Sequence, residues 1–300
     1  MESNRFLRRI KLVFPLAALA LVALVAVTTA MTILGDTQPN PTPAPSAGSS
    51  ATPARSSPVP APTSPPPTDT PVATVRLPST PPVVLTIYKG DHDPNRLWFV
   101  VWRYPQLRAD STPLASVVNQ DISDEVTTVI ETFEEGPAAQ RQAPGKTNNL
   151  TGSYVVDMVA PDLASFTLKW IDDTAPGHPV IHLETLTYAL NSGQRIDFSQ
   201  LFFDMDAAVA IISQQAQIQL SRSLGKHYDP AAVAFGAAAV IGNFPNWSLT
   251  TAGLKVTFYE YQVGTAAAGL PSVVIPWSLL KGVMQPNGPA ARLAGFATPT

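Results

Sequence analysis

The chain of 300 residues contains no cysteine. Disulfide frameworks, thiol nucleophiles and cysteine-ligated metal centres are therefore excluded, and no cysteine is present to carry an N-terminal lipid. Charged residues are scarce, at 14%, and histidine occurs only four times. There is also no Gly-x-Ser-x-Gly sequence, so nothing predicts the strained turn that presents a catalytic serine. We predict that the protein is not an enzyme and needs no cofactor.

An apolar run near the N-terminus is the first feature that the chain does have. Residues 12–34 carry no charge and, at about 1.5 Å per residue, would form a helix about 34 Å long, which matches the core of a bilayer. Four basic residues lie before it, so the positive-inside rule predicts a cytoplasmic tail at residues 1–11 and the remainder of the chain outside the cell. Cleavage as a signal peptide after residues 28–30 is the alternative.

Proline dominates the next segment. Residues 35–82 hold about half of the 31 prolines, mixed with Ser, Thr and Ala. This composition favours extended polyproline II and buries little surface, so we predict a disordered linker. The sequence that follows predicts an extracytoplasmic domain at residues 83–284 and a flexible tail at residues 285–300.

The part of the chain after the linker is acidic. Residues 83–300 hold 13 Lys and Arg against 19 Asp and Glu, which gives a formal net charge of −6. This charge argues against nucleic acid as a partner.

Two kinds of hydrophobic spacing alternate along the domain. Runs rich in β-branched and aromatic residues predict strands at 83–89, 97–104, 153–159, 165–171 and 179–190. Apolar residues at helical spacing predict one helix from Thr112-Pro113 to Gly136 and a second from Asp204 or Asp206 to Gly225. A last hairpin begins at Trp247, with an edge strand at 273–275 and a short helix from Pro276. The order predicts an α+β fold, with a mainly antiparallel sheet that carries two long helices.

Several stretches resemble a known family. The longest runs from Trp247 to Leu280, with Trp247-Ser-Leu-Thr-Thr-Ala-Gly-Leu-Lys-Val-Thr-Phe-Tyr-Glu-Tyr-Gln-Val, then Gly269 and Ser272-Val-Val-Ile-Pro-Trp-Ser-Leu-Leu280. Shorter ones are Tyr104-Pro-Gln-Leu, Val118-Asn119, Gly177-His178-Pro179, Thr187-Tyr-Ala-Leu-Asn-Ser-Gly-Gln-Arg-Ile196 and Leu201-Phe202. Together they resemble the RsiV-like domain, a family of largely unknown function in extracytoplasmic bacterial proteins.

The resemblance implies an α+β fold and a place in the cell envelope. One branch of the family adds a cytoplasmic domain that grips a sigma factor, and another adds a metal-dependent peptidoglycan deacetylase domain. We expect neither here, because only 11 residues precede the apolar run and 16 follow residue 284. What the resemblance implies is an accessory binding domain.

Two histidines and a glutamate form one candidate site. His182 and Glu184 would point to the same face of a strand, and His178 lies just before it. Three such groups can ligate zinc, but Pro179 disfavours the helix that a metalloprotease motif requires. We favour turn and strand-surface roles for these residues and expect no bound metal.

Two tyrosines form the other candidate site. A strand from Leu254 to Tyr261 would place Lys255, Tyr259 and Tyr261 on the face away from the core. Exposed tyrosines can stack on sugar rings or anchor a protein partner, although residues 225–244 would cover them in the alternative arrangement. We predict a ligand surface where residues 175–184 meet this hairpin.

These features lead to one expected function. We expect a single-pass membrane protein whose extracytoplasmic domain binds or senses cell-wall glycan or a wall-associated protein. The alternative is binding or inhibition of a lysozyme-type lytic enzyme, because a basic enzyme would be attracted to the acidic domain. Metal-assisted hydrolysis at His178 and His182 is a third alternative.

Overall fold

The computed structural model describes residues 79–136, 146–174 and 178–296, all of which belong to one compact unit, residues 69–300. The predicted tail at 1–11, the membrane anchor at 12–34 and nearly all of the linker at 35–82 lie outside the described residues. Within these described ranges, no helix is long and apolar enough to cross a membrane.

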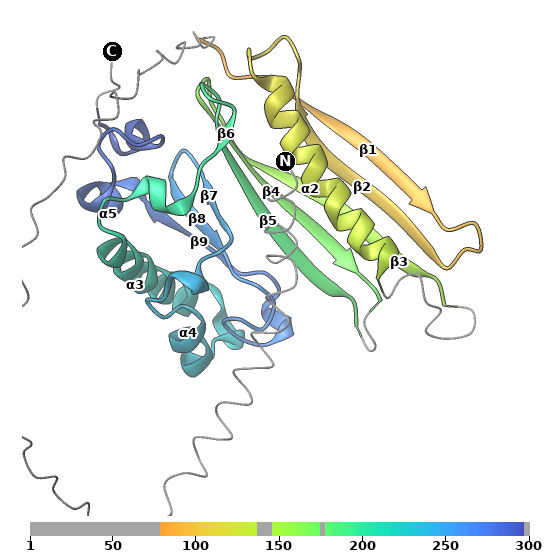
Figure 1. Cartoon of the computed structure of the whole chain (residues 1–300). Coiled ribbons are helices and arrows are strands. Elements are labelled where there is room, and N and C mark those ends of the chain that lie inside the picture. The colour runs from red at the N-terminus through yellow and green to blue at the C-terminus, as the bar shows by residue number, and fades with distance from the viewer. Residues whose placement is uncertain (1–78, 137–145, 175–177, 297–300) are drawn as a thin grey trace, which may run out of the picture. The chain divides into compact units, whose positions relative to one another are not determined.

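Six strands form a large sheet in which spatial order follows chain order (Figure 1). All neighbours are antiparallel except β2 and β3, which are parallel because α2 lies between them and returns the chain to the same end. The mainly antiparallel sheet is therefore confirmed. Its strands are β1 (Val84–His92), β2 (Trp98–Leu107), β3 (Asn148–Val159), β4 (Leu163–Asp172), β5 (Val180–Ala189) and β6 (Gln194–Arg195).

Helix α2 (Ala115–Glu135) covers one face of this sheet, and its buried residues recur every three or four positions, as the sequence predicts. The helix does not begin at Thr112-Pro113, where the sequence predicts its N-cap and first residue. The N-cap residue is Leu114, without a side-chain hydrogen bond, and the hydroxyl of Thr112 is buried without a partner. The main-chain oxygen of Thr112 instead accepts the N–H of Ala115, so a turn precedes the helix.

Asn119 of α2 completes the sheet where β3 no longer reaches β2. The ladder between these strands ends at Trp102 and Gly152. Further along, the side chain of Asn119 accepts the N–H of Leu107 and donates to its C=O, both at 2.7 Å. A helix side chain thus satisfies the backbone groups of Leu107 that a neighbouring strand would otherwise pair.

Trp102 is the centre of the core beneath α2, where it is completely buried. Gly152 lies beside it, and a Cβ at that glycine would come within 2.0 Å of the indole ring. Trp170 packs against Trp102, with ring centroids 5.6 Å apart. Gly152 is therefore required by the close approach of the indole.

A second sheet of three antiparallel strands contains β7 (Trp247–Leu249), β8 (Gly253–Thr257) and β9 (Ser272–Pro276). Helix α3 (Met205–Ser223) packs on β9, where the side chain of Gln219 bonds both the N–H and the C=O of Val274. The prediction that both long helices lie on one sheet is wrong, because α2 and α3 cover different sheets. Asp204 caps α3, as expected, by accepting the N–H of Ala207.

Short elements complete the described chain, which has four α-helices in all. The two short α-helices are α4 (Pro230–Gly236) and α5 (Trp277–Leu280). The 3-10 helices are η2 (Phe198–Leu201), η3 (Gly225–His227), η4 (Ile241–Asn243), η5 (Ala266–Ala268), η6 (Lys281–Val283) and η7 (Ala291–Ala294). Residues 285–296, expected in a flexible tail, contain η7, in which Arg292 pairs with Asp162 and Ala291 and Ala294 are buried.

Polar contacts join the two sheets. Lys255 of β8 donates to Asp157 of β3 at 2.7 Å, and this carboxylate also accepts the hydroxyl of Thr167 at 2.6 Å. The buried hydroxyl of Ser165 accepts the N–H of Leu249 at 3.0 Å. Lys255 was expected to point to solvent beside the tyrosines. It forms an ion pair between the sheets instead.

Candidate functional site

His178 and Tyr261 meet at the surface. They are 83 positions apart in the sequence, yet their ring centroids lie 6.2 Å apart and the Tyr261 hydroxyl is 3.4 Å from Nε2 of His178. Both residues are exposed, Tyr261 by 51%. The structure therefore brings the segment before β5 to the turn after β8, as the sequence predicted.

The turn that presents Tyr261 differs from the expected strand. Strand β8 ends at Thr257, so the predicted alternation as far as Tyr261 is wrong. The side chain of Gln262 accepts the N–H of Tyr259 at 3.0 Å and closes a turn in which Tyr261 has a φ of 66°. A left-handed conformation costs a non-glycine residue about 1–2 kcal/mol, so the surrounding contacts must hold Tyr261 in place.

The segment at 225–244 supplies those contacts. The side-chain nitrogen Nε2 of Gln262 donates to the C=O of Gly236 at 2.9 Å and to the C=O of Asn243 at 2.8 Å. Gly236 has no room for a side chain, because a Cβ there would lie 1.8 Å from the main-chain oxygen of Gln262. This segment and the turn thus form a rigid support under Tyr261.

Tyr259 and Tyr261 have different surroundings. Burial raises the pKa of Tyr259, although a hydrogen bond with Asn246 acts in the opposite direction. The side chain of Tyr259 is half-buried, whereas that of Tyr261 is exposed. Of the two candidate tyrosines, Tyr261 is therefore the more accessible to a ligand.

His182 packs within the sheet. Its ring stacks on Trp170 with centroids 5.3 Å apart and planes at 11°. Burial lowers the pKa of His182, although Asp172 acts in the opposite direction. In the part of the chain that the structure describes, no group of three His, Asp or Glu residues could hold a metal ion.

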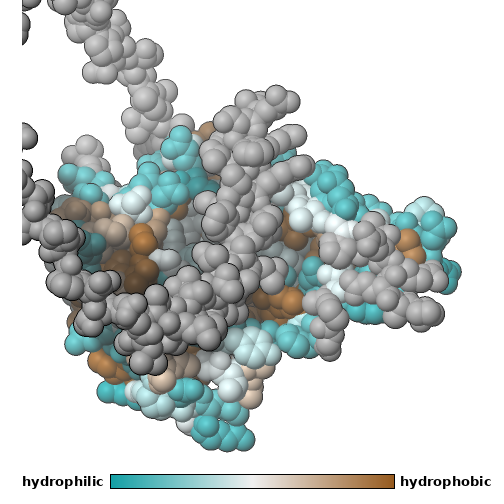
Figure 2. Space-filling model, turned by 60° about the horizontal axis from the view of Figure 1, so that its bottom comes forward, coloured by the Kyte–Doolittle hydropathy of each residue, from teal (hydrophilic) through white to brown (hydrophobic). Residues whose placement is uncertain are grey.

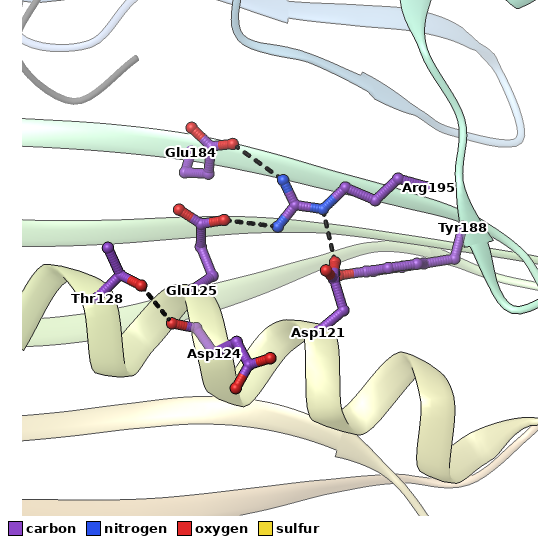
Figure 3. Close-up of polar contacts among 7 residues, drawn as sticks. All are labelled: Asp121, Asp124, Glu125, Thr128, Glu184, Tyr188 and Arg195. Carbon is purple, nitrogen blue, oxygen red and sulfur yellow. Dashed lines mark hydrogen bonds and ion pairs between the residues drawn. The ribbon is translucent and has the colours of Figure 1, made fainter. Parts of the chain in front are cut away.

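Glu184 belongs to a charged cluster between β5, β6 and α2 (Figure 3). Arg195 donates to Asp121 at 2.7 Å and to Glu125 at 2.8 Å, and it lies 3.5 Å from Glu184. The hydroxyl of Tyr188 donates to Asp121 at 2.9 Å. This cluster joins the helix to the edge of the sheet through three carboxylates and one guanidinium.

Burial and the surrounding charges shift two pKa values in this cluster. Burial raises the pKa of Tyr188, and the negative charge of Asp121 raises it further. For Arg195, burial acts to lower the pKa, but Tyr188 and the carboxylates of Glu125, Asp121 and Glu184 together raise it above its usual value. Both shifts favour the protonated side chains, which donate the hydrogen bonds and ion pairs that hold the cluster together.

A comparison with known families and structures identifies the C-terminal part of the chain. Residues 199–278 match the family model described as "Protein of unknown function (DUF3298)". The chain contains a DUF3298 domain. This domain runs from η2 to α5 and includes α3 and the small sheet. No curated protein matches the chain.

Two solved structures of the DUF3298 family resemble the chain. A protein from Pseudomonas aeruginosa is 11% identical, with a TM-score of 0.52 over 69% of this chain and 96% of that one. A family member from Bacteroides fragilis is 12% identical, with a TM-score of 0.48 over 74% and 98% of the two chains. At such identity, the Pseudomonas structure supports the fold alone. These comparisons name DUF3298, and they do not name the RsiV-like domain.

The candidate residues divide at the start of the DUF3298 domain. Tyr259 and Tyr261 lie within it, whereas His178, His182 and Glu184 lie before it. The pair of His178 and Tyr261 thus joins two parts of the chain. Most of the apolar residues quoted from the Trp247–Leu280 stretch are buried, so packing accounts for much of that pattern: Trp247, Leu254, Val256, Phe258, Ile275 and Trp277.

Sequence reasoning assigned no role to Arg195, Asp121, Glu125 or Tyr188. Glu125 is buried among the apolar residues of α2, and Asp121 lies four residues before it, partly buried beside the same face. Two acids on such a face require a buried cation, and that spacing was a signal that could have indicated the cluster. It could not have identified Arg195 as the partner.

Proposed function

We propose that residues 83–284 act as a binding or sensing module of the bacterial cell envelope, held outside the membrane by an anchor at residues 12–34. The ligand would be cell-wall glycan or a wall-associated protein. The resemblance to RsiV-like domains and the apolar and proline-rich segments of the sequence support this location.

One observation carries the proposal of a binding surface. Tyr261 is exposed and held at positive φ by Gln262, and His178 lies against its ring. An exposed tyrosine that the core does not need, fixed in a strained turn, is typical of a contact residue. The ring face of Tyr261 and the imidazole of His178 are suited to stack on a sugar ring and to bond its hydroxyl groups.

The test measures binding of the full chain, in mild detergent, to purified cell-wall sacculi. Replacing Tyr261 with Ala should weaken binding by about 1–3 kcal/mol, as expected for an aromatic anchor. His178→Ala should weaken it in the same direction. Phe203→Ala is the matched control. Phe203 is an aromatic residue that is 59% exposed, and it lies just before the N-terminus of α3, outside the proposed surface. Equal binding by the Tyr261 variant and the control would reject this surface.

The acidic charge of the domain favours a second candidate, a basic lytic enzyme. Residues 83–300 carry a formal net charge of −6, which would attract such an enzyme. Raising the ionic strength from about 0.01 M to about 1 M shortens the Debye length from about 30 Å to about 3 Å, so enzyme binding should weaken steeply. Stacking on glycan should change little, so the salt dependence distinguishes the two ligands.

A further inference from the structure

Exposed apolar residues occur at several places on the molecule, as the brown patches in Figure 2 show. The outer edge of the large sheet is one region where they are combined with free backbone groups. Strand β1 forms this edge and, among the described strands, pairs only with β2, in unbroken register over nine residues (Figure 1). The edge of a sheet offers a row of hydrogen-bond donors and acceptors to another strand.

The direction of these groups follows from a bond next to the strand. Arg108 donates its N–H to the C=O of Val83. Because bonding alternates along an antiparallel pair, the N–H and C=O groups of the odd-numbered residues of β1 point toward β2. Even-numbered residues therefore direct their N–H and C=O groups away from the sheet. Among the described residues, none bonds these groups at Val84, Thr86, Tyr88 and Gly90.

The usual protections of an edge strand do not occur in β1. Proteins block such edges with proline, bulges, short strands or lysines. The nine residues of β1 include no proline and no register shift. The lysine of this strand, Lys89, lies toward α2, where it donates to Thr127 at 3.1 Å. Tyr88 is 73% exposed and Leu85 is 41% exposed, so the edge is both open and apolar.

We propose that β1 pairs with β1 of a second copy of this chain, antiparallel and about a twofold axis, so that two six-stranded sheets become one. An antiparallel strand edge is complementary to itself under such an axis. Lys89 and Asp91 leave the strand itself without a formal net charge, so the strand adds no repulsion of its own between two copies.

The alternation of free groups restricts the register. Even-numbered residues must face even-numbered residues, and placing Tyr88 opposite Tyr88 uses all nine residues of the strand. Thr86 then faces Gly90 of the other copy. A shift by one residue toward the C-terminus would place Lys89 opposite Lys89, which like charges disfavour. A shift toward the N-terminus would centre the ladder on Ile87 and leave Asp91 and His92 unpaired. The structure thus favours a ladder centred on Tyr88.

The absence of cysteine provides a direct test in the full chain. Residues opposite each other in a hydrogen-bonded antiparallel pair have Cα atoms about 5.5 Å apart, within the range of a disulfide. Tyr88→Cys should therefore form a covalent dimer under mild oxidation. Thr86→Cys and Gly90→Cys should each remain monomeric alone and should cross-link when mixed. Phe203→Cys is the control for random collision.

Proline substitutions test the same edge without a thiol. Tyr88→Pro removes an N–H that faces outward, so it should abolish the cross-link of the mixed Thr86→Cys and Gly90→Cys chains while the fold, checked by circular dichroism, is kept. Ile87→Pro removes an N–H that faces β2 and should lower the melting temperature.

Three results would overturn the proposal. One is a folded Tyr88→Cys chain that stays monomeric, and another is cross-linking of Phe203→Cys to the same extent. The third is dimerisation of Thr86→Cys alone as readily as the mixture. The pairing is independent of the Tyr261 surface, because sacculus binding and cross-linking are measured with different variants.

Discussion

Arg195 follows a tight turn and Tyr261 lies within one, but the structure uses the two residues in opposite ways. Arg195 is surrounded by Asp121, Glu125 and Glu184, whereas Tyr261 is half exposed and contacts the exposed ring of His178. Both belong to stretches that suggested a family resemblance. The difference teaches that a recurring residue pattern can mark a fold requirement at one place and leave a free surface at another.

The largest effect should come from removing the guanidinium. Arg195→Met leaves three carboxylates without their cation, and breaking a buried ion pair in this way costs about 3–5 kcal/mol. We expect the lower end of that range because the Arg195 side chain is 25% exposed. Urea denaturation of the variant measures the loss. Arg195→Lys should be intermediate, because one ammonium cannot bond both Asp121 and Glu125 in the same geometry. A loss below about 1 kcal/mol would contradict a structural role.

Tyr188→Phe should have the next largest effect. The ring and its packing remain, but the hydrogen bond to Asp121 is lost, and hydrogen bonds to charged groups contribute about 1.5–3 kcal/mol. Thermal unfolding of the two proteins gives the difference. If the variant unfolds at the temperature of the parent chain, water replaces the hydroxyl at no cost.

The stacked histidine should make stability depend on pH. The pKa of His182 is lowered in the fold from 6.5, so the unfolded chain binds a proton more readily. Its contribution to stability is fully present above pH 6.5 and is lost as the pH falls through the lower folded pKa. His182→Gln should reduce the slope of stability against pH in this window. An unchanged slope would assign the dependence to other groups.

Tyr261→Ala should have the smallest effect on stability. Substitutions at exposed positions usually change the free energy of unfolding by less than about 0.5 kcal/mol. The same variant should lose sacculus binding, so the two measurements together separate surface from core. A large loss of stability would show that the ring of Tyr261 supports the turn.

The sequence predicted those parts of the fold that depend on local periodicity. The hairpin of β1 and β2, helices α2 and α3 and the cap at Asp204 follow from residues close together in the chain. The division into two sheets did not follow, because it depends on contacts such as that of Lys255 with Asp157, 98 positions apart. Side-chain alternation alone cannot distinguish solvent from the face of another sheet.

The candidate site was predicted in part for the same reason. Pairing the segment of His178 with the turn of Tyr261 was correct, but Tyr259 and His182 proved to be packed. The end of β8 depends on the side chain of Gln262, which reaches Gly236 and Asn243. No local sequence pattern predicts a glutamine side chain that bonds residues 19 and 26 positions away in the sequence.

The two hydrogen bonds of Asn119 have a mechanical consequence. In a chain anchored as proposed, tension from the membrane enters the domain at Val83, whose C=O accepts the N–H of Arg108. The neighbouring residue Leu107 is fastened to α2 through Asn119. Tension on the linker would therefore be transmitted from Val83 to Arg108, from there to the adjacent Leu107, and through Asn119 to α2. Asn119→Ala would leave this corner of the sheet free to peel, because no strand of the described chain supports it from the other side.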